Sequence, residues 1–217
     1  MCPGFLVAWN SDRMKCRSCG ESITRSLDRM CIECYINHNL PTEVHKISWV
    51  YVASFARTRR KEGRFDEELV SAITSMRSTM SKDKKVIILE SDGREISIPL
   101  NVESIDNLAK KSGILVGKWL IYRNASEIDT VWKVIAKSTI NGELGTSAKV
   151  STAMKKSKRH VICAYTANYL DLNDAMRVRE KLRQLGFTEE LCYKPDIYTY
   201  LGIYYRTTSL SPCRYRK

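Results

Sequence analysis

The sequence lacks the features that mark membrane proteins, secreted proteins and most enzymes. Its longest apolar run, residues 47–56, is interrupted by two serines and is too short to span a bilayer. The apolar patch at residues 5–9 has no basic residues before it, as a signal peptide would have. No Walker loop, GxSxG or HExxH motif occurs, and the three histidines have no obvious nucleophile or orienting partner. We therefore expect a non-catalytic protein of the cytoplasm.

Acidic residues are also in short supply. The 217-residue chain has 24 Asp or Glu against 36 Lys or Arg, a net charge of +12. The apolar share of 43% is that of a globular protein and excludes wholesale disorder. Such a charge predicts a polyanionic partner, meaning RNA, DNA or a ribosome surface, although solubility alone is an alternative explanation.

Four of the eight cysteines form a regular motif, whereas Cys2, Cys163, Cys192 and Cys213 are scattered. Two CxxC pairs separated by eleven residues can place four thiolates around one metal ion, and Zn²⁺ is the usual occupant of such a closed site. Two disulfides would need an oxidising compartment, and nothing else in the sequence suggests an iron–sulfur protein. We predict one structural Zn²⁺, with His38 and His45 as exposed loop residues, and with these ligands: Cys16, Cys19, Cys31 and Cys34.

Beyond the cysteine motif, apolar periodicity predicts interleaved strands and helices. The predicted strands lie at residues 85–90, 95–100, 117–123, 148–151, 160–166, 191–194 and 198–206, and residues 42–56 are either a strand or a short apolar element that links to the domain. The predicted helices lie at 66–80, 101–113 and 173–185, and a further helix starts at Asn124 and ends before Asn141. This order favours an α+β fold with a mainly antiparallel, curved sheet and helices on one face. We expect a zinc-ribbon or knuckle module at 1–40, a linker at 41–64 and the α+β domain at 65–217.

Several segments resemble known families. GKWLIY at 117–122 and EIDTVWKVI at 127–135 resemble the first strand and helix of the cap-binding translation initiation factor 4E fold, and residues 160–187 resemble a later strand and helix of it. GELGTSAKVST at 142–152 and YKPDIYTYLGIY at 193–204 are similar to the uncharacterised family of the basophilic-leukemia-expressed protein, whose fold is 4E-like. The resemblance covers residues 113–206.

The resemblance implies a scaffold with a concave sheet face suited to RNA or another ligand. It also implies that Trp132 meets a partner peptide on the convex face, although a core position is the simpler interpretation of this residue. Cap-binding factors hold the modified guanine between two loop tryptophans. Here the loop after Trp119 is too short for the first one and no tryptophan follows Trp132, so cap recognition is not carried over.

The basic residues gather in three stretches with few acids. Each stretch could bind phosphate, and a solvated loop or frayed tail is the alternative for each. Tyrosines near residue 200 are candidates for base stacking, although alternating Tyr is also ordinary sheet packing. The candidate nucleic-acid-binding residues are Arg57, Arg59, Arg60, Lys61 and Arg64; Lys149, Lys155, Lys156, Lys158 and Arg159; Lys194, Tyr198 and Tyr200; and Arg206, Arg214 and Arg216 of the tail.

Charge and resemblance together predict an RNA-binding or ribosome-associated protein of translation. Its expected partners are ribosomal RNA or mRNA, and ribosomal proteins or translation factors. A protein-interaction adaptor that uses the zinc module and the Trp132 helix face is the first alternative. An enzyme acting on a small anionic ligand is the second, and it requires a deep pocket near Lys149, Lys194 and Asp196.

Overall fold

The computed structural model describes residues 14–23, 30–54, 71, 73, 78–80, 85–89 and 93–217. The chain divides into two compact units, and each unit is assembled from two separate stretches. Unit 1 consists of residues 1–56 and 122–162, and unit 2 consists of residues 57–121 and 163–217. The predicted division at residues 40 and 64 stays a prediction.

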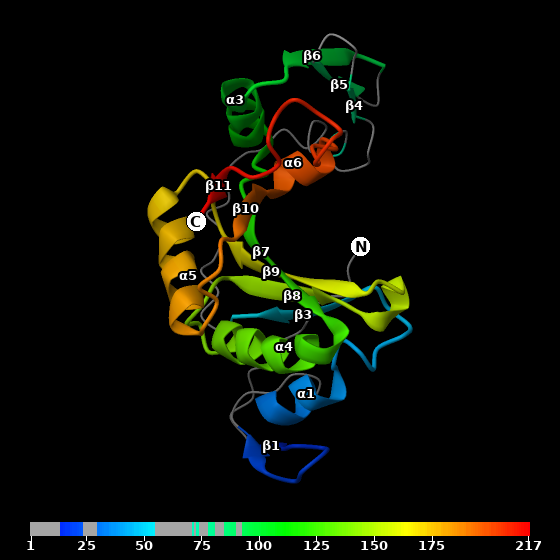
Figure 1. Ribbon diagram of the computed structural model, residues 1–217, viewed down its shortest axis with the longest axis vertical. Helices are drawn as coiled ribbons and strands as arrows, with labels where there is room; N and C mark the ends of the chain where they lie inside the picture. The colour runs from blue at the N-terminus through cyan, green and yellow to red at the C-terminus, as the bar shows by residue number, and fades with distance from the viewer. Residues whose placement is uncertain are drawn as a thin grey trace. The chain divides into compact units, whose positions relative to one another are not determined.

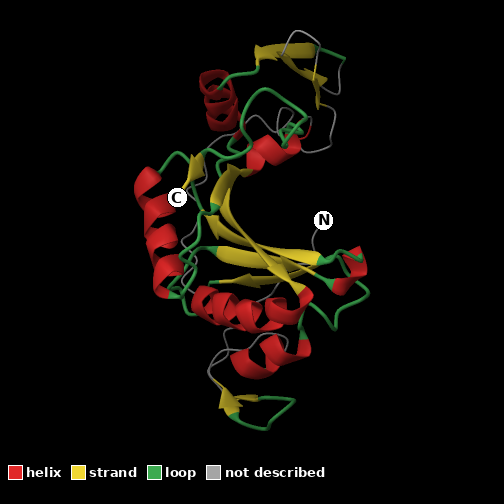
Figure 2. Ribbon diagram, viewed as in Figure 1, coloured by secondary structure: helices red, strands yellow, loops and turns green. Residues whose placement is uncertain are grey.

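Unit 1 contains a small cysteine-bearing part and a sheet covered by one long helix (Figures 1 and 2). The helix begins after Asn124, whose backbone N–H donates to the carboxylate of Glu127 at 3.4 Å, so the predicted helix start is confirmed. The elements are β1 (Met14–Lys15), β2 (Ser22–Ile23), α1 (Ile32–His38), β3 (Trp49–Ala53), α4 (Ala125–Ile140), β8 (Ser147–Ser151), the 3₁₀ turn η1 (Ala153–Lys155), the end of β7 (Gly117–Asn124) and the start of β9 (Arg159–Thr166).

The core of unit 1 lies between α4 and the sheet. Strands β3 and β8 pair antiparallel, with Val50 opposite Val150 and Val52 opposite Ala148. All four side chains are buried, and α4 contacts both strands. Because successive side chains of a strand point to opposite faces, the odd-numbered residues of β3 face away from α4.

Unit 2 contains a three-stranded sheet and the remaining part of the larger sheet. Its helix α3 behaves as the sequence predicts, since Asn101 accepts a hydrogen bond from the N–H of Ser104 and Gly113 ends the helix at φ 68°. The elements are β4 (Ser78–Met80), β5 (Lys85–Leu89), β6 (Glu95–Pro99), α3 (Val102–Ser112), α5 (Leu172–Gln184), β10 (Cys192–Pro195), α6 (Asp196–Tyr200) and β11 (Tyr215–Arg216), with the first part of β7 and the second part of β9.

Helix α5 is fixed to the sheet by buried polar side chains within unit 2. The indole N–H of Trp119 on β7 donates to the carbonyl of Ala175 at 2.9 Å, and its ring lies 4.9 Å from that of Tyr193. The guanidinium of Arg179, 1% exposed, donates to the carbonyls of Phe187, Glu189 and Lys217. Trp119 is fully buried and is therefore a core residue of unit 2.

The six-stranded sheet has the order β11-β10-β7-β9-β8-β3, and β4-β5-β6 form the second sheet. Every described strand pair whose register is known is antiparallel, including β5 and β6, which match the predicted strands at 85–90 and 95–100. The predicted α+β fold with a mainly antiparallel curved sheet and helices is therefore confirmed (Figure 2). None of the described helices is long and apolar enough to cross a membrane.

Three predicted elements are wrong in part. Of the segment predicted at 42–56, only Trp49–Ala53 form a strand, β3, because residues 42–48 form turns and loop. The predicted strand at 198–206 is instead the short helix α6 followed by turns, because Ile197, Tyr198 and Leu201 are buried at helical spacing after Pro195. The predicted helix at 66–80 ends earlier: residues 71 and 73 are helical, but residues 78–80 form β4 and pair with β5. The remainder of that helix lies outside the described residues.

A disulfide in unit 2 was not predicted. Cys192 on β10 and Cys213, two residues before β11, are bonded, with their Cα atoms 5.3 Å apart. The two strands pair with Cys192 opposite Arg216, which brings the cysteines together. Nothing in their spacing of 21 residues indicates this pairing in the sequence.

Candidate functional site

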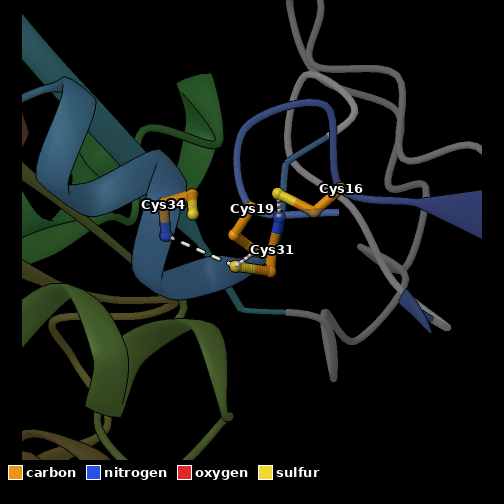
Figure 3. A group of neighbouring side chains, drawn as sticks. All are labelled: Cys16, Cys19, Cys31 and Cys34. Carbon is orange, nitrogen blue, oxygen red and sulfur yellow. Dashed lines mark hydrogen bonds between the residues drawn. The ribbon is translucent and has the colours of Figure 1, made fainter. Parts of the chain in front are cut away.

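The four motif cysteines converge in the N-terminal part of unit 1 (Figure 3). Their sulfur atoms all lie within 4.8 Å of one another, so the group could hold a metal ion. The first CxxC lies in the turn between β1 and β2, where Gly20 has φ 76°, and the second lies at the start of α1. A compact set of four thiols is the donor set of a closed structural metal site, which leaves no position for substrate.

Backbone N–H groups point at these sulfurs. The N–H of Cys31 donates to the sulfur of Cys16 at 3.2 Å, and the N–H of Cys34 donates to the sulfur of Cys31 at 3.4 Å. Hydrogen bonding, first from the backbone of Cys19, lowers the pKa of Cys16 to about 6. For Cys19, the lowering effect of the Glu21 backbone is outweighed by burial and by the neighbouring thiols, which raise its pKa to about 12. A cation among the sulfurs would favour the thiolate form of all four and release the protons.

Helix α1 links the cysteine cluster to α4. Cys31 caps α1, and Tyr35 and Ile36 of the same helix are buried. The helix lies against α4, where the ammonium of Lys137 is 2.5 Å from the carboxylate of Glu33 and has its pKa raised by that hydrogen bond. His38, which the sequence predicts in a loop, is instead the exposed last residue of α1. Its ring nitrogen Nε2 lies 3.0 Å from the hydroxyl oxygen of Ser18.

The chain after α1 is also bound to α4. The backbone N–H of Thr42 donates to the carboxylate of Asp129 at 3.1 Å, and its hydroxyl donates to the second oxygen of the same carboxylate. The cysteine cluster and the sheet of unit 1 therefore share one connected set of contacts through α4. We therefore expect a change at the cysteine cluster to alter the stability of the core of this unit.

Trp132 of α4 lies in the core of unit 1. It is fully buried, and its indole N–H has no hydrogen-bond partner among the residues that the structure describes. A buried ring cannot be a contact for a partner unless the core opens, so the core interpretation of Trp132 is confirmed. Its role in partner binding, implied by the resemblance, is not taken further.

The face of the unit 1 sheet opposite α4 gathers aromatic and basic side chains. Trp49 and Tyr51 alternate with the buried Val50 and Val52 and so lie on this face. Lys149 lies opposite Tyr51 in the pairing of β3 with β8 and so lies on the same face. The same alternation along β9 and β7 places Arg159 and Tyr122 on this face, and Lys155 reaches it over the ring of Trp49. We call the following set the aromatic–basic surface: Trp49, Tyr51, Tyr122, Lys149, Lys155 and Arg159.

Each ring of the aromatic–basic surface has a cation beside it. The ammonium groups of Lys155 and Lys149 lie 3.8 Å and 4.4 Å from the centroid of the Trp49 ring. Lys149 is also 5.6 Å from the Tyr51 ring, and the guanidinium carbon of Arg159 is 5.5 Å from the Tyr122 ring. These cation–π contacts place positive charge over the faces of partly exposed rings.

The loop that carries the basic residues is anchored where it leaves β8. The N–H of Thr152 donates to the carbonyl of Ser48 at 3.2 Å, and the N–H of Ala153 donates to the carbonyl of Pro41 at 2.9 Å. Lys156 ends η1 with φ 48°, a conformation that turns the chain sharply. Lys156 and Lys158 are exposed beside the anchored part. Lys155 is thus presented on a fixed turn.

Sequence reasoning identified the cations of this surface and missed its rings. The signal was present, because WVYVA at 49–53 places two aromatic residues on one face of a strand and two valines on the other. It was overlooked because the partner of this strand, β8, lies about 100 residues away. The contact between Tyr122 and Arg159 likewise joins two strands, β7 and β9, that no short pattern connects.

The tyrosines predicted to stack bases lie elsewhere, in unit 2. Tyr198 is 1% exposed, which removes its ring from any contact with RNA, and the half-buried Tyr200 follows it on α6. Lys194 is 4% exposed, and its ammonium donates to the carbonyl of Ile203 at 2.7 Å beneath the ring of Tyr204. Lys194 and Tyr198 are therefore corrected from candidate RNA contacts to core residues.

Lys194 has a buried cationic neighbour. It pairs with Lys118 across β10 and β7, and Lys118 forms an ion pair with Asp196 and a hydrogen bond to Thr199. Burial, followed by the charge of Lys118, lowers the pKa of Lys194 to about 8 from its usual 10.5. Asp196, which follows Lys194 closely in the sequence, forms its ion pair with Lys118.

This shift predicts a pH effect on stability. Between pH 8 and pH 10.5 the unfolded chain binds more protons at Lys194 than the folded chain does, so the free energy of unfolding rises with pH in this window. Lys194→Met should remove about 1–3 kcal/mol of that rise. Urea unfolding of both proteins at pH 7.5 and pH 10 measures it, since other titrating groups contribute equally. An identical pH dependence in both proteins would contradict the assignment.

The other predicted basic residues fall into two groups. In the tail, Arg214 donates to Asp106 at 2.7 Å, Arg216 donates to Glu190 at 3.2 Å, and the exposed Arg206 has φ 67°. The segment at 57–64 lies outside the described residues, together with the predicted contacts Arg57, Arg59, Arg60, Lys61 and Arg64. Both groups stay predictions.

Solved structures of translation initiation factor 4E are similar to the chain at low TM-scores. A schistosome eIF4E complexed with m7GpppA and 4E-BP is 16% identical over 79% of this chain and 97% of that chain, with a TM-score of 0.39. Ascaris suum eIF4E-3 with an m2,2,7G cap is 15% identical over 79% and 96%, with a TM-score of 0.37. At these scores the likeness says nothing about what this chain binds.

The family resemblance extends over most of the sequence. The model of the family described as Basophilic leukemia-expressed protein Bles03 matches residues 13–202. The match includes the four motif cysteines and the whole aromatic–basic surface, and it reaches well beyond the segment 113–206 on which the resemblance rested. The chain therefore belongs to the Basophilic leukemia-expressed protein Bles03 family.

Proposed function

We propose that this protein binds RNA without catalysing a reaction, through the aromatic–basic surface of unit 1. The observation that carries the proposal is the gathering of three cations and three rings on one sheet face that α4 does not cover. Lys149, Lys155 and Arg159 would contact phosphates, whose charge supplies most of the affinity in such complexes. No acidic residue occurs between Gly145 and His160, so no negative charge in that segment repels the phosphates.

The four-cysteine cluster supports the fold of unit 1 rather than a reaction. We propose that it holds one structural Zn²⁺, because four thiols within 4.8 Å of one another match the closed sites that this ion prefers. The bound ion would fix the start of α1, and α1 would in turn hold α4 behind the RNA-binding sheet.

The RNA is expected to be a ribosomal RNA or an mRNA, and the protein a component of translation. This part follows the resemblance in the sequence and not the geometry. The adaptor alternative lacks support from an exposed helix face, because Trp132 is buried and α1 lies on α4. Lys194 and Asp196 are engaged in the core of unit 2, which leaves the small-ligand alternative without support as well.

Salt titration of RNA binding tests the proposal. A labelled, unstructured 20-nucleotide RNA is titrated with the metal-loaded full chain at 50–200 mM KCl, and the affinity is read by fluorescence anisotropy. Three phosphate contacts should give a slope of log K against log[salt] of about −2, at about −0.7 per contact. A salt-insensitive complex, or no complex at 50 mM KCl, would contradict RNA binding by this surface.

A further inference from the structure

We infer that the aromatic–basic surface selects unpaired nucleic-acid strands and stacks their bases on Trp49, Tyr51 and Tyr122. The inference rests on the proposed function and names the class of ligand for the same site. It concerns the rings, whereas the proposed function requires only the cations. Each can therefore fail separately.

The three rings offer area that a base can cover. Tyr51 and Tyr122 are 39% and 46% exposed, which is high for tyrosines on strands of a packed sheet, and Trp49 is half-buried. All three rings lie on strands of one sheet, so their positions are fixed by backbone pairing and by the buried residues on the other face of the sheet. A base can stack on such rings whatever its identity, because every base has a π-face.

The cations lie next to the rings on which the bases of a strand would stack. Lys155 and Lys149 both lie within 4.4 Å of the centroid of the Trp49 ring, and Arg159 lies beside Tyr122. These cations lie over the ring faces, so a base that stacks on a ring takes the place of the cation, and the displaced ammonium or guanidinium stays within reach of the phosphate of that base. The surface therefore combines stacking with phosphate contact, the two components of single-strand recognition.

The spacing of the rings favours an unpaired strand over a duplex. Strands β3 and β7 are separated by β8 and β9, so the rings on β3 and the ring on β7 are about 14 Å apart across the sheet at about 4.8 Å per strand. An extended strand can lay bases on both positions. A duplex keeps its bases stacked on one another and presents only phosphates and groove edges to a sheet.

Base stacking makes no contact with the 2′-hydroxyl group, so stacking alone does not distinguish RNA from DNA. The rings and cations distinguish paired from unpaired strands, and they distinguish nucleic acid from a polyanion without bases. We therefore expect single-stranded RNA and single-stranded DNA of the same sequence to bind alike at this surface.

The test compares four probes and three proteins at one salt concentration. The probes are a 12-nucleotide unstructured RNA, the same sequence as DNA, a 12-base-pair RNA duplex, and polyphosphate. The proteins are the full chain, Trp49→Ala and Trp49→Phe, with circular dichroism showing that each is folded. Trp49→Ala should bind both single strands about 5- to 100-fold more weakly. Trp49→Phe should recover much of the loss, and neither change should alter binding of duplex or polyphosphate.

The outcomes separate the two proposals. A full chain that binds the duplex as tightly as the single strands, or a Trp49→Ala protein that loses affinity for all probes equally, would overturn the inference and leave RNA binding standing. A full chain that binds no RNA would overturn the proposed function itself. If Trp49→Ala is unfolded, Tyr122→Ala replaces it with the same expectations.

Discussion

Cys31→Ser should reduce the bound metal from about one ion per chain to less than about one tenth of an ion. Serine is a favourable N-cap residue, so the start of α1 keeps its cap. The substitution then removes only one of the four sulfur ligands. Apparent binding free energies of structural zinc are about 10–16 kcal/mol in small zinc modules, so loss of the ion removes most of the folding energy of this part. Elemental analysis after dialysis measures the metal content.

The matched control is Cys163→Ala, which removes a buried thiol that is not part of the cluster. It should retain its metal. Because α1 packs on α4 next to the Glu33–Lys137 ion pair, Cys31→Ser should also lower the melting temperature of the unit 1 core, and a chelator should do the same to the wild type. Full metal content in Cys31→Ser would contradict the four-sulfur site.

Neutralising the three cations of the aromatic–basic surface should cost about two orders of magnitude in RNA affinity at 0.1 M salt. Each phosphate contact with a single strand contributes about 0.7 to the slope of log K against log[salt], or about fivefold in affinity at this concentration. The triple variant Lys149→Gln, Lys155→Gln and Arg159→Gln should therefore flatten the slope by about 2. Anisotropy titrations at several salt concentrations measure both quantities.

A second triple variant controls for net charge. Lys110→Gln, Lys111→Gln and Lys133→Gln remove the same three charges from exposed positions on α3 and α4, none of which belongs to the aromatic–basic surface. This control should lose less than about threefold in affinity. Equal losses in the two triples would show that overall charge, and not this surface, attracts the RNA.

The elements that the sequence predicts well are those with local signals. Asn101 and Gly113 enclose α3, and the Glu127 carboxylate at Asn124 starts α4, because caps depend on residues three or four positions apart. The CxxC pairs belong to the same class, since each pair sits in one turn and the metal donor set follows from spacing alone.

The elements that were missed depend on contacts between distant residues. The segment after Pro195 has tyrosines in alternation, which is typical of a strand, but burial of Ile197, Tyr198 and Leu201 makes it helix α6. The pairing of Tyr51 with Lys149, and of Cys192 with Cys213, joins positions that no short pattern connects. The candidate RNA-binding surface could therefore be predicted in its charges but not in its rings.

Indole N–H resonances during an RNA titration report on the aromatic–basic surface directly. The chain has four tryptophans, of which Trp49 lies on this surface and Trp119 and Trp132 are fully buried, while Trp9 lies outside the described residues and is assigned with Trp9→Phe. In the ¹⁵N-labelled protein, single-stranded RNA should shift the resonance of Trp49 in a saturable manner and leave those of Trp119 and Trp132 in place. RNA that binds to saturation with the Trp49 resonance unmoved would show that it binds elsewhere.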